Sequence, residues 1–201
     1  MKELKSYILE VLNTKDYKGP KRFTAGGTIS NRILLFDIDE TLLKSDAKIY
    51  VYKDNEIVRT LTPEEFNFDH LNSGESYDFN EFSDIKVLMR SVMLPYWNTL
   101  QREYRRGTHI GILTARSNIK MIDQFFNSKG IDIKDDLIFA VGDETLDLTS
   151  KDIEDRKAEC VERLFEVGYN TFIFFDDNQN NLNSVKKLEN KLPIKIHTIK
   201  A

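Results

Sequence analysis

The sequence has little of the residue types that build disulfide scaffolds, zinc sites and basic binding surfaces. Its 201 residues include one cysteine, three histidines and four prolines. The single Cys160 excludes an internal disulfide and indicates a reducing compartment, so we expect a cytoplasmic location. The net charge of −4 and the pI of about 5.5 argue against wrapping a nucleic-acid backbone, because phosphate binding requires a basic surface.

Long apolar runs are also absent. No run approaches the roughly 20 residues of a membrane span, and the first residues lack the apolar core of a secretory signal. We therefore expect no membrane partner. Hydrophobic residues make up 40% of the chain and charged residues 31%, which is typical of a globular protein rather than a disordered one. The length predicts a single domain over residues 1–201.

The first 31 residues predict a helix followed by an arm. Apolar residues share one helical face over residues 1–13, at Leu4, Ile8, Val11 and Leu12. Residues 14–31 are basic and contain the flexible Gly26-Gly27 pair. This arm is interpreted either as a contact to a phosphorylated ligand or as a solvated connector.

Beyond the arm, apolar runs and helical periodicities alternate. Strands are predicted over residues 33–36, 110–113, 137–141, 171–175 and 194–199, and helices over residues 118–129, 153–167 and 179–188. This alternation implies right-handed crossovers and an α/β, Rossmann-like parallel sheet of about five strands flanked by helices. Ligands bind such sheets at the carboxyl ends of the strands.

The first two of these strands are about 70 residues apart, which is more than a plain crossover needs. Asp54-Asn55 lies between two alternating runs and predicts a hairpin. Residues 66–82 show no clear period, and residues 84–106 predict a helix broken or restarted at Pro95. Residues 43–82 are therefore interpreted as a small insertion, or cap, over the strand ends.

Polar side chains follow three of the predicted strands. Asp37 and Asp39 follow the first, Thr114 and Arg116 the second, and Asp176-Asp177 the fourth. They should meet at one edge of the sheet, where close carboxylates repel unless a cation or a shared proton relieves them. The hard cation Mg²⁺ suits such oxygen ligands, whereas zinc would require nearby His or Cys.

These segments resemble the four motifs of haloacid-dehalogenase-like hydrolases, in the family's order. The first is the Asp37-Ile-Asp-Glu-Thr-Leu segment, and the second is Thr114 at the end of an apolar strand. The third is Lys157 at the head of a helix, and the fourth is Asp176-Asp177 after two phenylalanines. The resemblance covers roughly residues 32–199, and four ordered elements are more specific than one DxDxT motif.

The resemblance implies a role for each residue. Asp37 would be the nucleophile that forms an aspartyl-phosphate, and Asp39 the general acid and base. Thr114 and Lys157 would bind the transferring phosphoryl group. Mg²⁺ would be held by Asp37, the backbone carbonyl of Asp39, Asp176 and Asp177. An aspartate at position 39 favours hydrolysis of phosphate esters over cleavage of carbon–halogen or carbon–phosphorus bonds.

Three assignments have competitors within the sequence. Lys151 lies close to Lys157 and could be the phosphate-binding lysine instead. The segment beginning Gly142-Asp143 also comes after a strand and resembles another form of the fourth motif, which would make Asp143 the metal ligand. Arg116 is interpreted either as a substrate-binding residue or as part of a structural salt bridge.

The leading functional hypothesis is a hydrolase acting on a small phosphate monoester. A nucleic-acid-end 3′-phosphatase or a nucleotidase is the first alternative, because Arg102, Arg105 and Arg106 form a basic stretch, although the overall acidity disfavours nucleic acid. The second alternative is a non-catalytic binding or regulatory module on the same fold, because fold does not prove function.

Overall fold

A five-stranded parallel sheet lies at the centre of the part of the chain that the computed structural model describes, residues 31–66 and 68–201. Its strands lie in the order β10 (Lys195–Lys200), β9 (Thr171–Asp176), β1 (Arg32–Phe36), β7 (His109–Thr114) and β8 (Ile138–Ala140). All neighbouring pairs are parallel. The predicted α/β, Rossmann-like sheet of about five strands is therefore confirmed.

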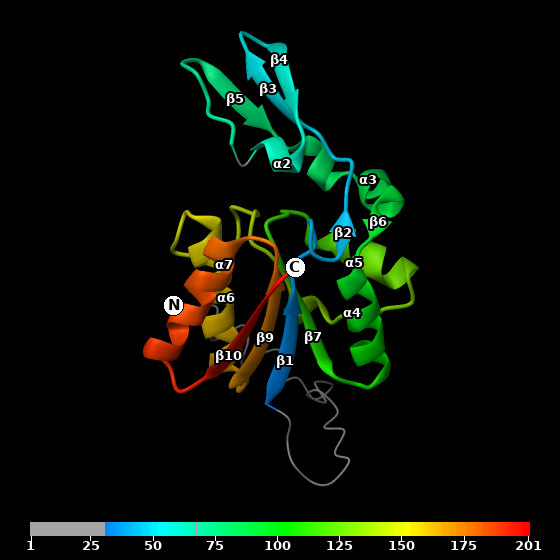
Figure 1. Ribbon diagram of the computed structural model, residues 1–201, viewed down its shortest axis with the longest axis vertical. Helices are drawn as coiled ribbons and strands as arrows, with labels where there is room; N and C mark the ends of the chain where they lie inside the picture. The colour runs from blue at the N-terminus through cyan, green and yellow to red at the C-terminus, as the bar shows by residue number, and fades with distance from the viewer. Residues whose placement is uncertain (1–30, 67) are drawn as a thin grey trace. The chain divides into compact units, whose positions relative to one another are not determined.

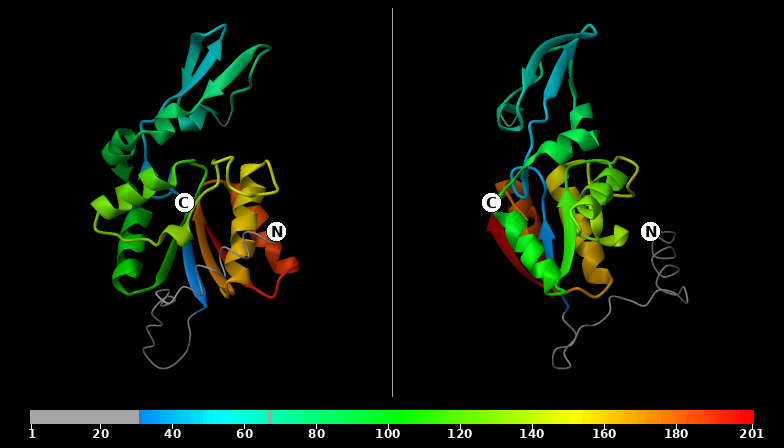
Figure 2. Two further views of the ribbon diagram at one scale, coloured as in Figure 1. Left: turned by 180° about the vertical axis from the view of Figure 1, so that it is seen from behind. Right: turned by 90° about the vertical axis from the view of Figure 1, so that its right-hand side faces the viewer.

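Helices cover both faces of this sheet (Figures 1 and 2). One face packs against α4 (Pro95–Arg105) and α5 (Ile119–Ser128), and the other against α6 (Ile153–Glu166) and α7 (Gln179–Lys186). Side chains alternate along β1, so Leu34 and Phe36 enter the first core while Ile33 and Leu35 enter the second. Two buried cores explain why the strand reads as a continuous apolar run.

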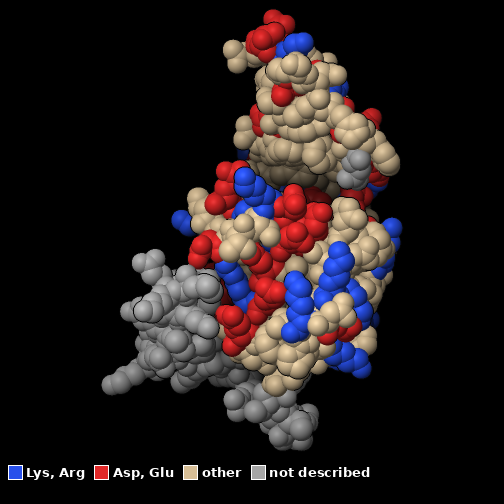
Figure 3. All heavy atoms as spheres, turned by 90° about the vertical axis from the view of Figure 1, so that its left-hand side faces the viewer, with Lys and Arg blue, Asp and Glu red and all other residues tan. Residues whose placement is uncertain are grey.

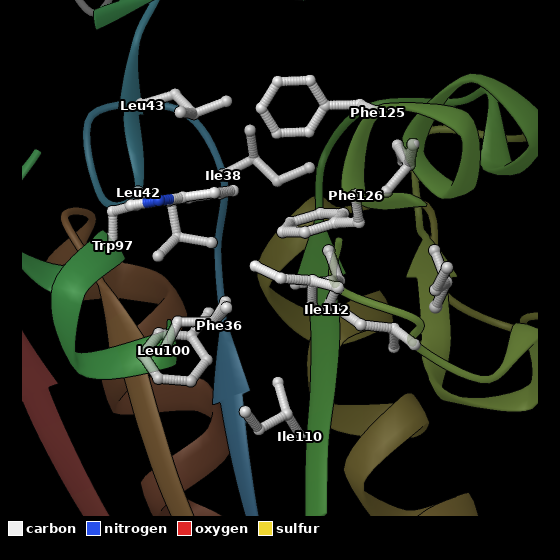
Figure 4. Close-up of a cluster of buried hydrophobic side chains, with 14 of the residues drawn as sticks. Phe36, Ile38, Leu42, Leu43, Trp97, Leu100, Ile110, Ile112, Phe125 and Phe126 are labelled. Carbon is white, nitrogen blue, oxygen red and sulfur yellow. The ribbon is translucent and has the colours of Figure 1, made fainter. Parts of the chain in front are cut away.

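Aromatic rings fill the core on the α4 and α5 side (Figure 4). Trp97 of α4 stacks on Phe126 of α5 at 5.7 Å between ring centroids. Next to the edge that carries the polar side chains, Phe36 stacks on Phe175 at 4.4 Å with an angle of 8° between the rings. This stack fixes β1 against β9 directly before both strands reach an aspartate.

The chain leaves the sheet after β1 and forms a second, three-stranded sheet. Its strands are β3 (Ile49–Lys53), β4 (Glu56–Leu61) and β5 (Glu75–Asp78), in the order β4-β3-β5. The predicted hairpin is confirmed, since Asp54 and Asn55 join β3 to β4 with positive φ angles of 51° and 66°. Two left-handed residues are the signature of a type I′ turn, which asparagine and aspartate tolerate.

The two ends of this insertion are joined by a short antiparallel ladder between β2 (Leu43–Lys44) and β6 (Val92–Met93). By this pairing it extends past residue 82 and includes α3 (Ile85–Arg90). Helix α2 (Pro63–Phe66) lies between β4 and β5, and 3₁₀ turns occupy Asn80–Ser83, Asp135–Leu137 and Lys187–Asn190.

The structure adds one element to this region and corrects one expectation. Residues 66–82, which show no clear period, contain β5, and the helix expected over residues 84–106 is interrupted by β6 as well as restarted at Pro95. The second difference has a local cause, because Pro95 disfavours helix in the preceding residue and Leu94 is extended, with φ −89° and ψ 168°.

The predicted helix over residues 1–13, and the arm over residues 14–31 except for Asn31, lie outside the described residues. Among the helices that are described, none has the length and apolar character needed to cross a lipid bilayer.

Gly142→Ala should destabilise the fold at the loops that carry the polar side chains. A Cβ at position 142 would lie 2.0 Å from the carbonyl oxygen of Ala115, so the two loops would have to separate. We expect the free energy of unfolding to fall by about 3 kcal/mol or more, measured by urea denaturation. Gly107→Ala is the control, because its Cβ meets no atom within 4 Å and only the positive φ of 74° costs about 1–2 kcal/mol. A Gly142→Ala protein as stable as the control would contradict the prediction.

Candidate active site

Two buried aspartates lie side by side at the carboxyl edge of the sheet. Asp37 directly follows β1, and Asp176 is the last residue of β9. The register pairs Phe36 with Phe175, and the amide N–H of Asp37 donates to the carbonyl oxygen of Phe175 at 2.9 Å. The two carboxylates therefore start from neighbouring strands and are 5% and 0% exposed.

Lys157 joins the two aspartates. Its Nζ lies 2.9 Å from Oδ1 of Asp37 and 2.7 Å from Oδ2 of Asp176. The residue is 1% exposed and lies in the second turn of α6, which starts at this edge of the sheet. A lysine buried so deeply needs carboxylate partners. Lys151, its competitor in the sequence, is exposed before α6 begins.

Asp176 accepts further hydrogen bonds from the start of α7. The amide N–H of Asn178 donates to its Oδ1 at 2.8 Å, and Nδ2 of Asn181 donates to Oδ1 and Oδ2 at 3.0 and 3.1 Å. Asn181 is 7% exposed and was not predicted as a site residue. Its place in the first turn of α7, directly after the strand that ends in Asp176, is the signal that could have identified it.

Asp177 completes a group of three carboxylates. Asp37, Asp176 and Asp177 each offer an oxygen, and these oxygens lie within 4.8 Å of one another. Such an all-oxygen set fits the ligand preference of Mg²⁺. Asp143 follows β8 at the edge of the sheet and does not belong to this group; its Oδ1 accepts hydrogen bonds from the backbone and hydroxyl of Thr145.

Asp39 is paired with Arg116. The Nε and Nη2 groups of Arg116 donate to Oδ2 and Oδ1 of Asp39 at 2.9 and 2.7 Å. Arg116 is 3% exposed, and its Nη1 also donates to the carbonyl oxygen of Phe82 at 2.6 Å. From the sequence, Arg116 is interpreted either as part of a salt bridge or as a substrate-binding residue. The structure shows the salt bridge, and substrate binding by Arg116 stays a prediction.

Thr114 ends β7, the other neighbour of β1, and is fully buried. Its hydroxyl accepts a hydrogen bond from the amide N–H of Arg116 at 3.3 Å. The hydrogen bonds of the described residues thus join Thr114 to Arg116 and not to the three carboxylates. Thr114 is at the expected edge of the sheet, but its role in binding a phosphoryl group stays a prediction.

The turn after β1 holds a strained residue. Glu40 has a positive φ of 55°, and its amide N–H donates to the carbonyl oxygen of Leu43 at 2.9 Å, which turns the chain back into β2. Residues other than glycine avoid this conformation, and such strain is concentrated at functional sites. The turn places Asp39 between Asp37 and β2.

The site carries more negative than positive charge. It contains four aspartates, namely Asp37, Asp39, Asp176 and Asp177. Among the described residues, the ion pairs with these aspartates come from Lys157 and Arg116. If all four acids ionise, two negative charges remain, which matches one divalent cation. The residues present therefore fit a site for Mg²⁺ in charge as well as in ligand type.

The pKa values reflect this excess. Burial, reinforced by the charges of Asp176 and Asp39, raises the pKa of Asp37 to about 8 although Lys157 opposes the shift. Burial and the charge of Asp176 also raise the pKa of Asp177. Burial lowers the pKa of Lys157, but Asp37 and Asp176 outweigh it and leave the pKa above its ordinary value. Lys157 thus stays charged while Asp37 holds a proton unless another cation is bound.

Neither the comparison with protein-family models nor the comparison with curated proteins gives a match for this chain. A functional proposal therefore depends on the residues and geometry of this site.

Lys157→Met should destabilise the protein by about 3–5 kcal/mol at neutral pH, because it leaves the buried Asp37 and Asp176 without their shared cation. Lys151→Met is the matched control, and its effect should stay within about 0.5 kcal/mol because Lys151 is exposed. Urea denaturation of both variants measures the difference. Equal stabilities would show that Lys157 does not neutralise the aspartates.

The stability of the metal-free protein should fall as the pH rises. The folded-state pKa of Asp37, about 8, lies above its ordinary value of 3.8, so the native state keeps a proton that the unfolded chain releases in this window. Between about pH 5 and about pH 8 we expect a loss of more than about 1.4 kcal/mol in the free energy of unfolding, measured in a chelator. Asp37→Asn should reduce this loss, and Asp143→Asn should not. Stability that rises with pH in the parent protein would refute the prediction.

Proposed function

We propose that this chain is a magnesium-dependent phosphatase of the haloacid-dehalogenase-like kind, which hydrolyses a phosphate monoester through an aspartyl-phosphate on Asp37. One observation carries the proposal: a buried aspartate at a strand end, held by Lys157, beside two further aspartates whose excess charge fits a divalent cation. A carboxylate in this setting is a suitable nucleophile for a phosphoryl group.

In the first step, Asp37 attacks phosphorus. Lys157 holds Oδ1 of Asp37, so Oδ2, which accepts no hydrogen bond from the described residues, is the candidate nucleophile. A new bond forms between Oδ2 and phosphorus as the bond from phosphorus to the alcohol oxygen breaks. The electron pair of the broken bond stays on the alcohol oxygen, which takes a proton from the carboxylic acid of Asp39.

In the second step, water releases the phosphoryl group. The water oxygen attacks phosphorus and gives its proton to the carboxylate of Asp39. The bond between phosphorus and Asp37 breaks, its electrons return to the Asp37 carboxylate, and inorganic phosphate leaves. The side chain of Asp39 is 22% exposed and is therefore open to solvent, whereas that of Arg116 is 1% exposed.

Cations stabilise the charge of the transferring group. Lys157 contacts the nucleophile and is positioned to offset its charge during transfer. Mg²⁺, held by the carboxylates of Asp37, Asp176 and Asp177 with the carbonyl of Asp39, would neutralise phosphoryl oxygens. Asn181 would orient Asp176 as a ligand through its two hydrogen bonds.

A small substrate is preferred to a nucleic-acid end. Arg102 and Arg106, two residues of the basic stretch, both pair with Glu103. They lie at the carboxyl end of α4, just before β7 begins, and thus at the edge of the sheet opposite to Asp37. On the one face that Figure 3 shows, acidic and basic side chains are intermixed.

Hydrolysis of 4-nitrophenyl phosphate with and without Mg²⁺ tests the proposal. We expect turnover that a chelator removes and that Asp37→Asn lowers by at least about 10³-fold. A transient phosphoryl group on the peptide that contains Asp37, detected by mass spectrometry, would identify the nucleophile. Asp143→Asn is the control, and its rate should be roughly that of the parent protein because Asp143 lies outside the carboxylate group.

A panel of sugar phosphates, nucleotides and phosphorylated DNA ends accompanies this assay. Turnover confined to DNA ends would replace the small substrate by a nucleic-acid end. Mg²⁺ binding with no turnover of any ester would support a non-catalytic module instead.

A further inference from the structure

Arg116 fixes the plane of the Asp39 carboxylate. Two parallel hydrogen bonds, 2.9 Å from Nε and 2.7 Å from Nη2, reach the two oxygens of Asp39. Such a bidentate pair defines the orientation of a carboxylate as well as its charge, which a lysine ammonium cannot do. Ser45 adds only a long contact of 3.4 Å from its hydroxyl to Oδ1.

The insertion in turn holds Arg116. Nη1 donates to the carbonyl oxygen of Phe82 at 2.6 Å, and the guanidinium carbon lies 5.2 Å from the centroid of the Phe82 ring. Phe82 belongs to the 3₁₀ turn Asn80–Ser83 and contacts Phe79, whose ring also packs on Phe66 and Tyr77 of the insertion. A chain of contacts thus runs from the insertion's aromatic cluster through Arg116 to Asp39.

Because the Arg116 side chain is buried, its contacts with Asp39 and Phe82 determine its orientation. The side chain is 1% exposed, so water cannot replace a lost partner. Its backbone is held as well, since the amide N–H donates to the hydroxyl of Thr114. The guanidinium therefore has one orientation, which Phe82 and Asp39 define together.

We propose that Arg116 is a positioning residue: it orients Asp39 for proton transfer to the leaving alcohol, and it takes its own orientation from Phe82 of the insertion. The inference rests on the proposed phosphatase function and deepens it. It links the insertion to the first chemical step through an arginine that does not need to touch the phosphoryl group.

Dependence on the leaving group distinguishes this role from phosphate binding. A poor leaving group such as phenolate needs its proton during bond cleavage more than 4-nitrophenolate does. A misplaced Asp39 therefore slows phenyl phosphate more than 4-nitrophenyl phosphate. Loss of a phosphate-binding cation slows both esters alike, because the phosphoryl group is the same.

The experiment compares kcat/KM for phenyl phosphate and 4-nitrophenyl phosphate in the Mg²⁺-loaded full-length protein. Arg116→Lys should raise the ratio in favour of 4-nitrophenyl phosphate by at least about 10-fold. Asp39→Asn is the reference and should raise it further. Phe82→Leu, which removes the ring but keeps the carbonyl acceptor, should raise it by a smaller factor. Phe68→Leu, the same change at a phenylalanine of the insertion that is 84% exposed, should leave it unchanged.

The ratio does not depend on the fraction of folded enzyme, so partial unfolding of a variant cannot imitate the expected result. An equal loss for both esters in Arg116→Lys would overturn the positioning role and assign Arg116 to phosphate binding. An unchanged ratio in Phe82→Leu would overturn the contribution of the Phe82 ring to the orientation of Arg116, because this substitution keeps the carbonyl acceptor. No turnover by the parent protein on either ester would overturn the proposed function and this inference with it.

Discussion

The ammonium of Lys157 between Asp37 and Asp176 is the interaction on which the site and its surroundings depend. It joins α6 to β1 and β9 at one buried point, with distances of 2.9 and 2.7 Å. Without it, the sheet could not bring two carboxylates to adjacent strand ends out of water. The stack of Phe36 on Phe175 sets the spacing of the strands one residue earlier. The chemistry at this edge therefore depends on core packing as directly as on charge.

Asp39 is held in place by different contacts from those that hold Asp37 and Asp176. Asp37 and Asp176 are held by regular strands, whereas Asp39 lies in a turn with a left-handed Glu40 and receives its orientation from Arg116. The two halves of the proposed reaction thus have separate supports. The nucleophile is fixed by the sheet, and the acid is fixed by a salt bridge that reaches the insertion through Phe82.

Much of the sheet and most of the site's membership could be predicted from the sequence, for physical reasons. Strands buried on both faces appear as apolar runs, and parallel strands bring the residues at their carboxyl ends to one edge of the sheet. This logic placed Asp37, Thr114 and Asp176 at one edge of the sheet. The order of the motifs favoured Asp176 over Asp143, and Asp176 is the one that lies in the carboxylate group, but its role as a metal ligand stays a prediction. Lys157 was favoured over Lys151 by its place at the start of a helix, and it is the lysine that contacts Asp37 and Asp176, but its binding of a phosphoryl group stays a prediction.

The features that could not be predicted depend on tertiary contacts, which produce no hydrophobic periodicity in the sequence. β5 pairs with β3 across the insertion, and β6 pairs with β2 through only two residues on each strand. The bond from Arg116 to the Phe82 carbonyl uses a backbone atom that every residue has, so no residue type indicates it. Propensity and periodicity describe local order, and these features are decided by tertiary packing.

The β2–β6 ladder has an evolutionary consequence. Because Leu43 pairs with Met93 and Lys44 with Val92, the insertion departs from and rejoins the core at one place. Residues 45–91 supply no strand to the five-stranded sheet, so natural variation can lengthen, shorten or exchange this segment while that sheet keeps its pairing. Each replacement would still have to offer Arg116 an acceptor where Phe82 now does. The sequence of the insertion could then vary widely, while the hydrogen bond from Arg116 to the insertion would be kept.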